Sequence, residues 1–178
     1  KEDFLYEPYG VLYYYMYVEQ AVNREKDKGK TFLVFDMGGS TTDLALIQIN
    51  KSGNMSTSFP KARSIEVAGS NFDEFVLKRL KETSFKDVKK DLFDDQLREA
   101  NALERIEDVK KELCSMNGSR NGAIKNISLF DVECSISYKN LEDWVLEWWS
   151  QSGLEEAVTT FIKSNKERNE GDKTFLGY

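Results

Sequence analysis

The chain has 178 residues, 40% of them hydrophobic and 12% aromatic, which is enough apolar material for a buried core and excludes an intrinsically disordered segment. Its 25 basic and 31 acidic residues give a net charge of −6 without any block of Lys and Arg, which argues against a nucleic-acid partner. The sequence contains no His, and its two cysteines lack CxxC spacing, so a zinc site is not expected.

The sequence shows no run of about 18 apolar residues, so it predicts no membrane span. It has no recognisable signal peptide, and Cys114 and Cys134 fit a reducing compartment, although a single disulfide between them stays open. We therefore expect a cytoplasmic protein. Because the chain begins with Lys1 and not with Met, we expect it to be part of a longer protein or to be trimmed at its N-terminus.

The first part of the chain predicts a tyrosine-rich helix followed by three strands. The helix is expected over 8–24, because Pro8 suits a first helical position, and its many tyrosines suggest packing on more than one side. Strands are expected at 31–36, 41–49 and 62–67, where apolar runs alternate with turn residues. Their short connections predict an antiparallel meander.

Two amphipathic helices are predicted next. The first begins after the segment 68–71, with Ser70 or Asn71 as its N-cap, and continues to about Glu82. The second is expected over 94–116, because apolar residues recur on one broad face until a polar, glycine-containing segment stops it. Each helix should therefore bury one side.

A strand pair and a tryptophan-rich helix follow. The strands are expected at 123–130 and 132–138, around a tight turn. Asn140 is the expected N-cap of the helix, because Asp143 follows it by three places, and the helix has a possible break at 152–153. Its three tryptophans are interpreted as core residues, with an interface as the alternative. Residues 165–178 are interpreted as a polar tail that ends in the start of a further strand.

The segment 32–47 combines an apolar strand, a glycine-rich turn and a second strand. Glycines and hydroxyl-bearing residues form the turn: Gly38, Gly39, Ser40, Thr41 and Thr42. Such a turn can present backbone N–H groups and hydroxyls to an anion, and the flanking Asp36 and Asp43 could hold a hydrated Mg²⁺. On these residues alone, a phosphate cradle and a plain β-hairpin loop are both open.

A second candidate constellation lies on the helix expected over 94–116. Its members have the spacing i, i+3, i+4 and i+7, and they are Glu107, Lys110, Lys111 and Cys114. A solvated charged face is the plain interpretation. A carboxylate, two ammonium groups and a small polarisable residue could also hydrogen-bond ribose hydroxyls and cover a purine ring with alkyl stems.

Several segments, in this order, resemble the second half of the ATPase domain of the seventy-kilodalton heat-shock chaperones (DnaK type), within the actin-like ATPase superfamily. They are Glu7-Pro8, FLVFDMGGSTTDLALI (32–47), AGSNFDEFVLKRL (68–80), LERIEDVKKELCS (103–115) and ISLFDVECSISYKNLEDWV (127–145). The resemblance covers about residues 5–165. It implies a mixed α/β fold, that of lobe II of an actin-like, ribonuclease-H-like ATPase domain.

The resemblance also implies a division of the chain. Residues 1–24 would form an interlobe helix. Residues 25–68 and 145–178 would form a base subdomain with a mixed sheet and the phosphate loop. Residues 69–144 would form an α+β upper subdomain with the adenosine-side helix.

The same resemblance implies that ATP or ADP is bound together with Mg²⁺. The backbone of the loop 38–41 and the Thr41 hydroxyl would contact the β- and γ-phosphates, and Gly69 would lie near them at a helix N-terminus. The adenosine would be clamped by the four residues of the second constellation, Glu107, Lys110, Lys111 and Cys114.

Catalysis in the family implies three further roles. Asp36 would orient the attacking water or the hydrated Mg²⁺, and Asp43 would support the metal-bound water. Glu7 would reach the Mg²⁺-phosphate region from the interlobe helix. Together with Thr41, Asp36 and Glu7 form the expected catalytic set.

The chain departs from the family pattern and covers only part of it. Ser40 stands where a third glycine is usual, and Cys114 stands where a serine is usual, so we expect a divergent relative. The first phosphate loop and the catalytic Lys of the other lobe are not in this sequence. We expect a full-length parent that hydrolyses ATP slowly and a fragment that is inactive alone, because phosphoryl transfer needs charge stabilisation from both sides.

The implied partners are the remaining lobe of the parent ATPase domain and a nucleotide-exchange factor or client protein, with neither nucleic acid nor membrane. Three alternatives stay open. The parent could be a pseudo-ATPase or nucleotide-switched interaction domain, a sugar-kinase-like or polyphosphate-processing member of the superfamily, or a nucleotide-independent interaction domain.

Overall fold

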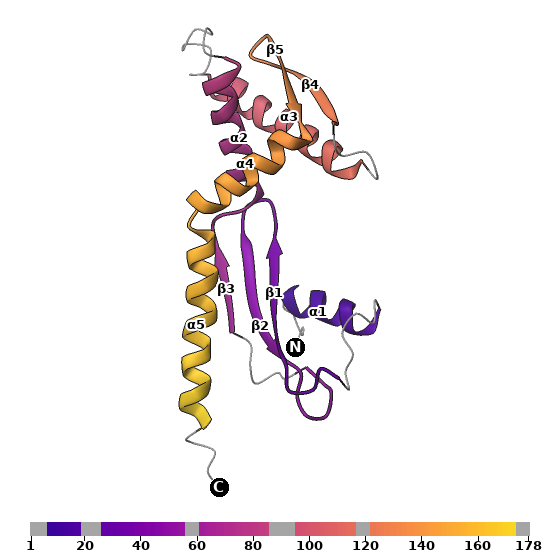
Figure 1. Ribbon diagram of the computed structural model, residues 1–178, viewed down its shortest axis with the longest axis vertical. Coiled ribbons are helices and arrows are strands. Elements are labelled where there is room, and N and C mark those ends of the chain that lie inside the picture. Colours follow the sequence, from indigo (N-terminus) through magenta and orange to yellow (C-terminus); the bar gives the residue numbers. More distant parts are fainter. Residues whose placement is uncertain (1–6, 19–25, 56–60, 86–94, 117–121, 174–178) are drawn as a thin grey trace. The chain divides into compact units, whose positions relative to one another are not determined.

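A computed structural model of the chain describes residues 7–18, 26–55, 61–85, 95–116 and 122–173. These residues form a mixed α/β structure of five helices and two antiparallel sheets, which confirms the predicted fold class (Figure 1). The chain divides into two compact units, Lys1–Ala68 with Leu154–Tyr178, and Gly69–Gly153. Their correspondence to the subdomains of a larger lobe stays a prediction, and each unit is described by itself.

The first unit is organised by a three-stranded sheet with the order β1-β2-β3. Its strands are β1 (Thr31–Met37), β2 (Thr42–Gln48) and β3 (Lys61–Ile65), and both pairings are antiparallel. This confirms the predicted meander. The central strand is buried from Leu44 to Ile47 on both of its faces, which explains its unbroken apolar run.

Helix α1 (Glu7–Tyr17) covers one face of this sheet through Leu12 and Met16, which pack with Val34, Ala45 and Ile47. The helix had been expected over 8–24, and residues 19–25 lie outside the described residues. Its exposed side carries Tyr13, Tyr14, Tyr15 and Tyr17, which are between 39% and 49% exposed. Burial on more than one side is therefore not observed for this helix within the described residues.

Helix α5 (Leu154–Lys173) covers the opposite face of the sheet and runs along β3 in Figure 1. Phe161 packs with Leu44 and Leu46 of β2, and Ile65 of β3 joins the same cluster. The segment expected to be a polar tail from residue 165 instead continues this helix to Lys173. The predicted further strand falls largely on residues 174–178, which lie outside the described residues.

The second unit combines three helices with a two-stranded hairpin. Its elements are α2 (Gly69–Thr83), α3 (Gln96–Ser115), β4 (Ile124–Leu129), β5 (Val132–Ser137) and α4 (Tyr138–Gln151). Val76, Leu80, Ile106, Leu113 and Ile136 are almost fully buried in it. Because α2 starts at Gly69, the predicted caps Ser70 and Asn71 lie inside the helix.

The tight turn predicted between the two strands is present, and it is unusual in composition. Phe130 and Asp131 have φ values of 53° and 62°, which is the left-handed region that favours glycine or asparagine. Phe130 is only 7% exposed and lies edge-on to Phe85, with ring centroids 6.1 Å apart. Packing of this aromatic ring therefore offsets the conformational cost of the turn.

Helix α4 begins three residues earlier than the sequence suggested. Ser137 is the N-cap, and its side chain accepts a hydrogen bond from the Asn140 amide at 3.0 Å while the Asn140 side chain accepts one from the Ser137 amide. Asn140 is thus the third helical residue and not the cap. The predicted break is confirmed, because Gly153 adopts a φ of 73° between α4 and α5.

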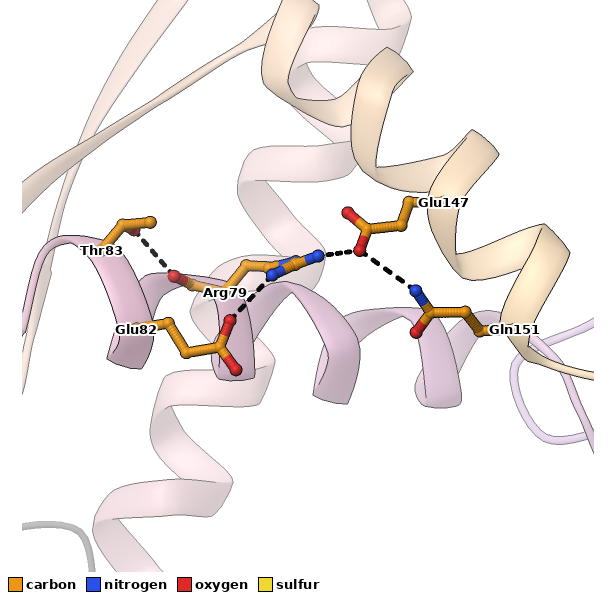
Figure 2. Close-up of polar contacts among 5 residues, drawn as sticks. All are labelled: Arg79, Glu82, Thr83, Glu147 and Gln151. Carbon is orange, nitrogen blue, oxygen red and sulfur yellow. Dashed lines mark hydrogen bonds and ion pairs between the residues drawn. The ribbon is translucent and has the colours of Figure 1, made fainter.

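Arg79 links α2 to α4, as Figure 2 shows. Its guanidinium forms ion pairs with Glu147 of α4 and, at 2.8 Å, with Glu82 of its own helix. Gln151 donates a second hydrogen bond to Glu147 at 3.1 Å. Trp148, on the same part of α4, is buried against Phe72 at a centroid distance of 5.5 Å, in agreement with its interpretation as core.

We expect Ser137→Ala to destabilise this chain by about 1 kcal/mol, because the first-turn amide of α4 loses its acceptor. Urea unfolding measures the change. Ser150→Ala is the matched control, since the Ser150 hydroxyl only donates to the Glu147 carbonyl on an exposed face. Equal effects of the two substitutions would contradict the capping role.

Candidate functional site

The candidate phosphate loop closes the β1–β2 hairpin at one end of the sheet. Met37 and Thr42 are opposite each other in the register, and the Gly38 amide donates to the Thr41 carbonyl at 2.9 Å. Gly38, Gly39 and Ser40 are exposed. Of the two open interpretations, the hairpin geometry is therefore observed, and phosphate binding by this exposed hairpin loop stays a prediction.

The glycines of this loop are not required by its backbone. Neither Gly38 nor Gly39 has a positive φ. A Cβ added at Gly39 would meet nothing within 4 Å, and one added at Gly38 would meet only the Thr41 carbonyl oxygen at 3.4 Å. Glycine also serves where the backbone must come close to a ligand. Because Gly38 and Gly39 carry no side chain, a ligand can approach the backbone of this loop.

Two carboxylates lie opposite each other next to this loop. Asp36 of β1 pairs with Asp43 of β2, and both are half-buried. Like charges directly opposite on neighbouring strands are unfavourable, so a cation that interacts with both would relieve a cost built into the hairpin. Thr41 donates to the Asp43 carboxylate at 3.3 Å and so connects this pair to the loop.

The carboxylate pair fits a hydrated Mg²⁺ better than a dehydrated ion. Within the described ranges, no group of three or more His, Cys, Asp or Glu side chains could hold a metal ion. Mg²⁺ commonly keeps several waters and binds through one or two carboxylates, which is what Asp36 and Asp43 can offer. Glu7 begins α1, the helix on the face of the sheet that carries Val34, and its side chain is exposed.

Thr42 corrects one expectation about the loop hydroxyls. Its side chain is fully buried and donates to the Val67 carbonyl at 2.6 Å, across 25 residues of sequence. This hydroxyl therefore stabilises the start of β2 and is not directed to an anion. Of the hydroxyls considered, those of Ser40 and Thr41 remain as candidate phosphate ligands.

The constellation predicted on α3 is present as a stripe along the helix surface, and it contains two different kinds of ion pair. Lys111 binds Glu107 of the same helix at 2.8 Å, with side chains 66% and 47% exposed. The Lys111 hydrogen bond lowers the pKa of Glu107, and Glu107 in turn raises the pKa of Lys111. Cys114 is exposed one turn further along the helix.

Lys110 is held differently, by a residue of α2 that the sequence did not single out. Its Nζ donates to the Asp73 carboxylate at 2.6 Å, and the two side chains are only 21% and 8% exposed. Nζ also lies 5.8 Å from the centre of the Phe72 ring. The sequence contains a signal for this ion pair. Asp73 interrupts the apolar stripe of α2, and a buried carboxylate needs a charged or hydrogen-bonding partner.

Burial raises the pKa of Asp73, and the hydrogen bond and charge of Lys110 oppose this rise without reversing it. The folded-state pKa thus lies above the unfolded value. This carboxyl therefore favours the folded state in acid, and that contribution is lost as the pH rises through the folded pKa. Loss of the proton from Asp73 leaves a poorly solvated carboxylate, which the hydrogen bond from Lys110 compensates.

The two cysteines are both thiols, so the open possibility of a disulfide is not realised. Burial, with a smaller effect of Glu133, raises the pKa of Cys134 to about 11, so this thiol stays protonated and unreactive at neutral pH. Cys134 is a core residue of the hairpin, and only Cys114 has an exposed side chain.

The structure distributes the predicted site residues over both units. The first unit carries the catalytic, metal and phosphate-loop residues: Glu7, Asp36, Gly38, Gly39, Ser40, Thr41 and Asp43. The second carries Gly69, at the start of α2, and the α3 residues Glu107, Lys110, Lys111 and Cys114. One hairpin holds Asp36, Asp43 and the loop next to each other. Gly69 lies on α2 and Lys110 lies on α3, and the hydrogen bond between Lys110 and Asp73 connects these two helices.

None of the described helices is long and apolar enough to cross a membrane.

A comparison with protein families finds that the model of the Hsp70 protein family matches residues 21–163. The match includes the loop, α2, the α3 stripe and α4, and it excludes Glu7. Proteins of the Hsp70 family belong to the actin-like ATPase superfamily, and they generally bind ATP or ADP with Mg²⁺. Because most of the chain is matched, the chain belongs to the Hsp70 family of chaperone-type ATPases.

Proposed function

We propose that this chain is a nucleotide-binding lobe fragment of a divergent Hsp70-type ATPase. In the proposal, the loop 38–41 binds the β- and γ-phosphates through its backbone and the Thr41 hydroxyl. Glu107, Lys110, Lys111 and Cys114 contact the adenosine. The observation that carries it is the exposed Gly38-Gly39 pair, since the hairpin needs glycine at neither position for its own backbone.

The carboxylates beside the loop supply the catalytic part of the proposal. Asp36 orients the attacking water or the hydrated Mg²⁺, and Asp43, which accepts from Thr41, supports a metal-bound water. Glu7 approaches the same region from α1. When bound, Mg²⁺ neutralises charge on the phosphates. The cross-strand repulsion of Asp36 and Asp43 makes the binding of a cation favourable at this position.

In the full-length protein, nucleotide binding is proposed to regulate a client protein or a nucleotide-exchange factor. In the proposal, this chain supplies one side of the phosphate clamp, so turnover requires the remaining lobe of the parent domain. The finer assignment as a slow ATPase competes with a pseudo-ATPase that binds nucleotide without hydrolysing it. That second candidate is favoured by the departures at Ser40 and Cys114.

We expect Asp36→Ala in the full-length protein to lower ATP turnover on the order of 10²-fold, because a positioned group at the reacting phosphate is lost. Asp131→Asn is the control, since that side chain is exposed on the β4–β5 turn and asparagine tolerates the φ of 62° at this position. Single-turnover hydrolysis measures the rate. Unchanged turnover in Asp36→Ala contradicts its catalytic role, and binding without turnover in the wild type favours the pseudo-ATPase.

We expect Gly39→Ala to weaken MgADP binding by the full-length protein at least tenfold, while leaving the stability of the fold unchanged or raised by up to about 1 kcal/mol. The added methyl has room within the hairpin but lies where the phosphates must approach. Gly29→Ala is the control, because it should change the stability of the fold and not the nucleotide affinity. Gly29 has a φ of 79°, so this substitution should cost about 1 kcal/mol of stability without affecting nucleotide affinity.

We expect the isolated chain to bind MgATP weakly or not at all, because it supplies one side of a two-sided phosphate site. Isothermal titration calorimetry on the chain and on the full-length protein makes the comparison. A low-micromolar affinity of the isolated chain would contradict the need for the second lobe.

A further inference from the structure

We propose that Asp73 is a positioning residue that holds the Lys110 ammonium in place for contact with the adenosine. This inference rests on the proposed function, in which Lys110 is a nucleotide-binding residue. It assigns to α2 a part in organising the adenosine side of the site, in addition to the phosphate-side role proposed for Gly69.

The first support is the contrast between the two lysines of the α3 stripe. Lys111 is paired within its own helix and remains 66% exposed, so solvent screens its ion pair. Lys110 is 21% exposed and is paired with an Asp73 carboxylate that is 8% exposed, on a different helix. A lysine side chain has four flexible carbons, and a single buried acceptor from a neighbouring element restricts where its ammonium can lie.

The second support is that the residues that hold Lys110 are themselves fixed. Phe72 and Asp73 are consecutive in α2, and both are buried. The Phe72 ring lies 5.8 Å from Lys110 Nζ and also packs on Trp148 of α4. Arg79 joins the same two helices two turns further along α2. The acceptor of Lys110 is therefore part of a packed core.

The third support is chemical capacity. An ammonium group has three donors, and the Asp73 carboxylate takes one of them at 2.6 Å. The others can serve ribose hydroxyls or ring nitrogens. Without Asp73, Lys110 would lose the carboxylate to which its ammonium is hydrogen-bonded, and the side chain would turn toward solvent. Asp73 also lies four residues after Gly69, one helical turn from the start of α2.

The test uses the full-length protein and titration with MgADP. We expect Asp73→Asn, which keeps the shape and removes the charge, to weaken binding about tenfold, as Lys110→Met does. The double variant should be no weaker than either single variant, because both remove the same placed ammonium. Asp73→Glu restores the charge and should recover part of the affinity. Asp143→Asn is the matched control, since Asp143 accepts from Lys139 at 2.7 Å on an exposed face of α4.

A second readout does not depend on nucleotide. In ¹⁵N-lysine NMR spectra, the hydrogen-bonded Lys110 ammonium should give a slowly exchanging signal that disappears in Asp73→Asn and returns in Asp73→Glu. A signal that persists in Asp73→Asn overturns the inference, as does wild-type affinity of that variant when Lys110→Met binds weakly. Additive losses in the double variant also overturn it. Failure of the wild type to bind MgADP would instead refute the proposed function, and the NMR result would still decide whether Asp73 holds Lys110.

Discussion

The burial of strand β2 on both faces is the constraint on which the candidate phosphate loop depends. Leu44 and Leu46 face α5, while Ala45 and Ile47 face α1, so one strand supplies the centre of two apolar layers. A shift of one residue in the register would exchange these faces, so that side chains packed against one helix would meet the other. The register therefore leaves Asp36 opposite Asp43 and the loop 38–41 at the end of the sheet.

Among the described residues of the second unit, three ion pairs connect α2 to neighbouring helices. Arg79 binds Glu147 of α4, and Asp73 and Lys81 bind Lys110 and Glu99 of α3. Apolar contacts are non-directional, whereas a hydrogen-bonded ion pair has one favourable geometry, so these contacts specify the position of the helix more than they add to stability. The raised pKa of Asp73 reflects this balance, since its burial outweighs its partner.

The main features of the candidate site could be predicted from local patterns. The loop was identifiable because its glycines and hydroxyls follow an apolar strand directly, and the stripe of α3 was identifiable because helical spacing places Glu107, Lys110 and Lys111 on one side. Thr42 and Asp73 could not be assigned in the same way. Their partners are 25 and 37 residues away along the chain, and no short-range pattern specifies which distant atom a buried polar group meets.

By itself, the sequence determined the order of helices and strands, the antiparallel meander and the two tight turns, because hydrophobic periodicity and turn chemistry act over a few neighbours. Only the tertiary structure decided that the loop glycines are free of backbone strain, that Ser137 caps α4, and that Lys110 is held by Asp73 while Lys111 stays in solvent. The glycine torsions and the Ser137 cap are local features that short-range patterns do not specify uniquely. The Asp73–Lys110 pair depends on the approach of segments far apart in the chain, where burial removes water and a polar group must find its partner within the protein.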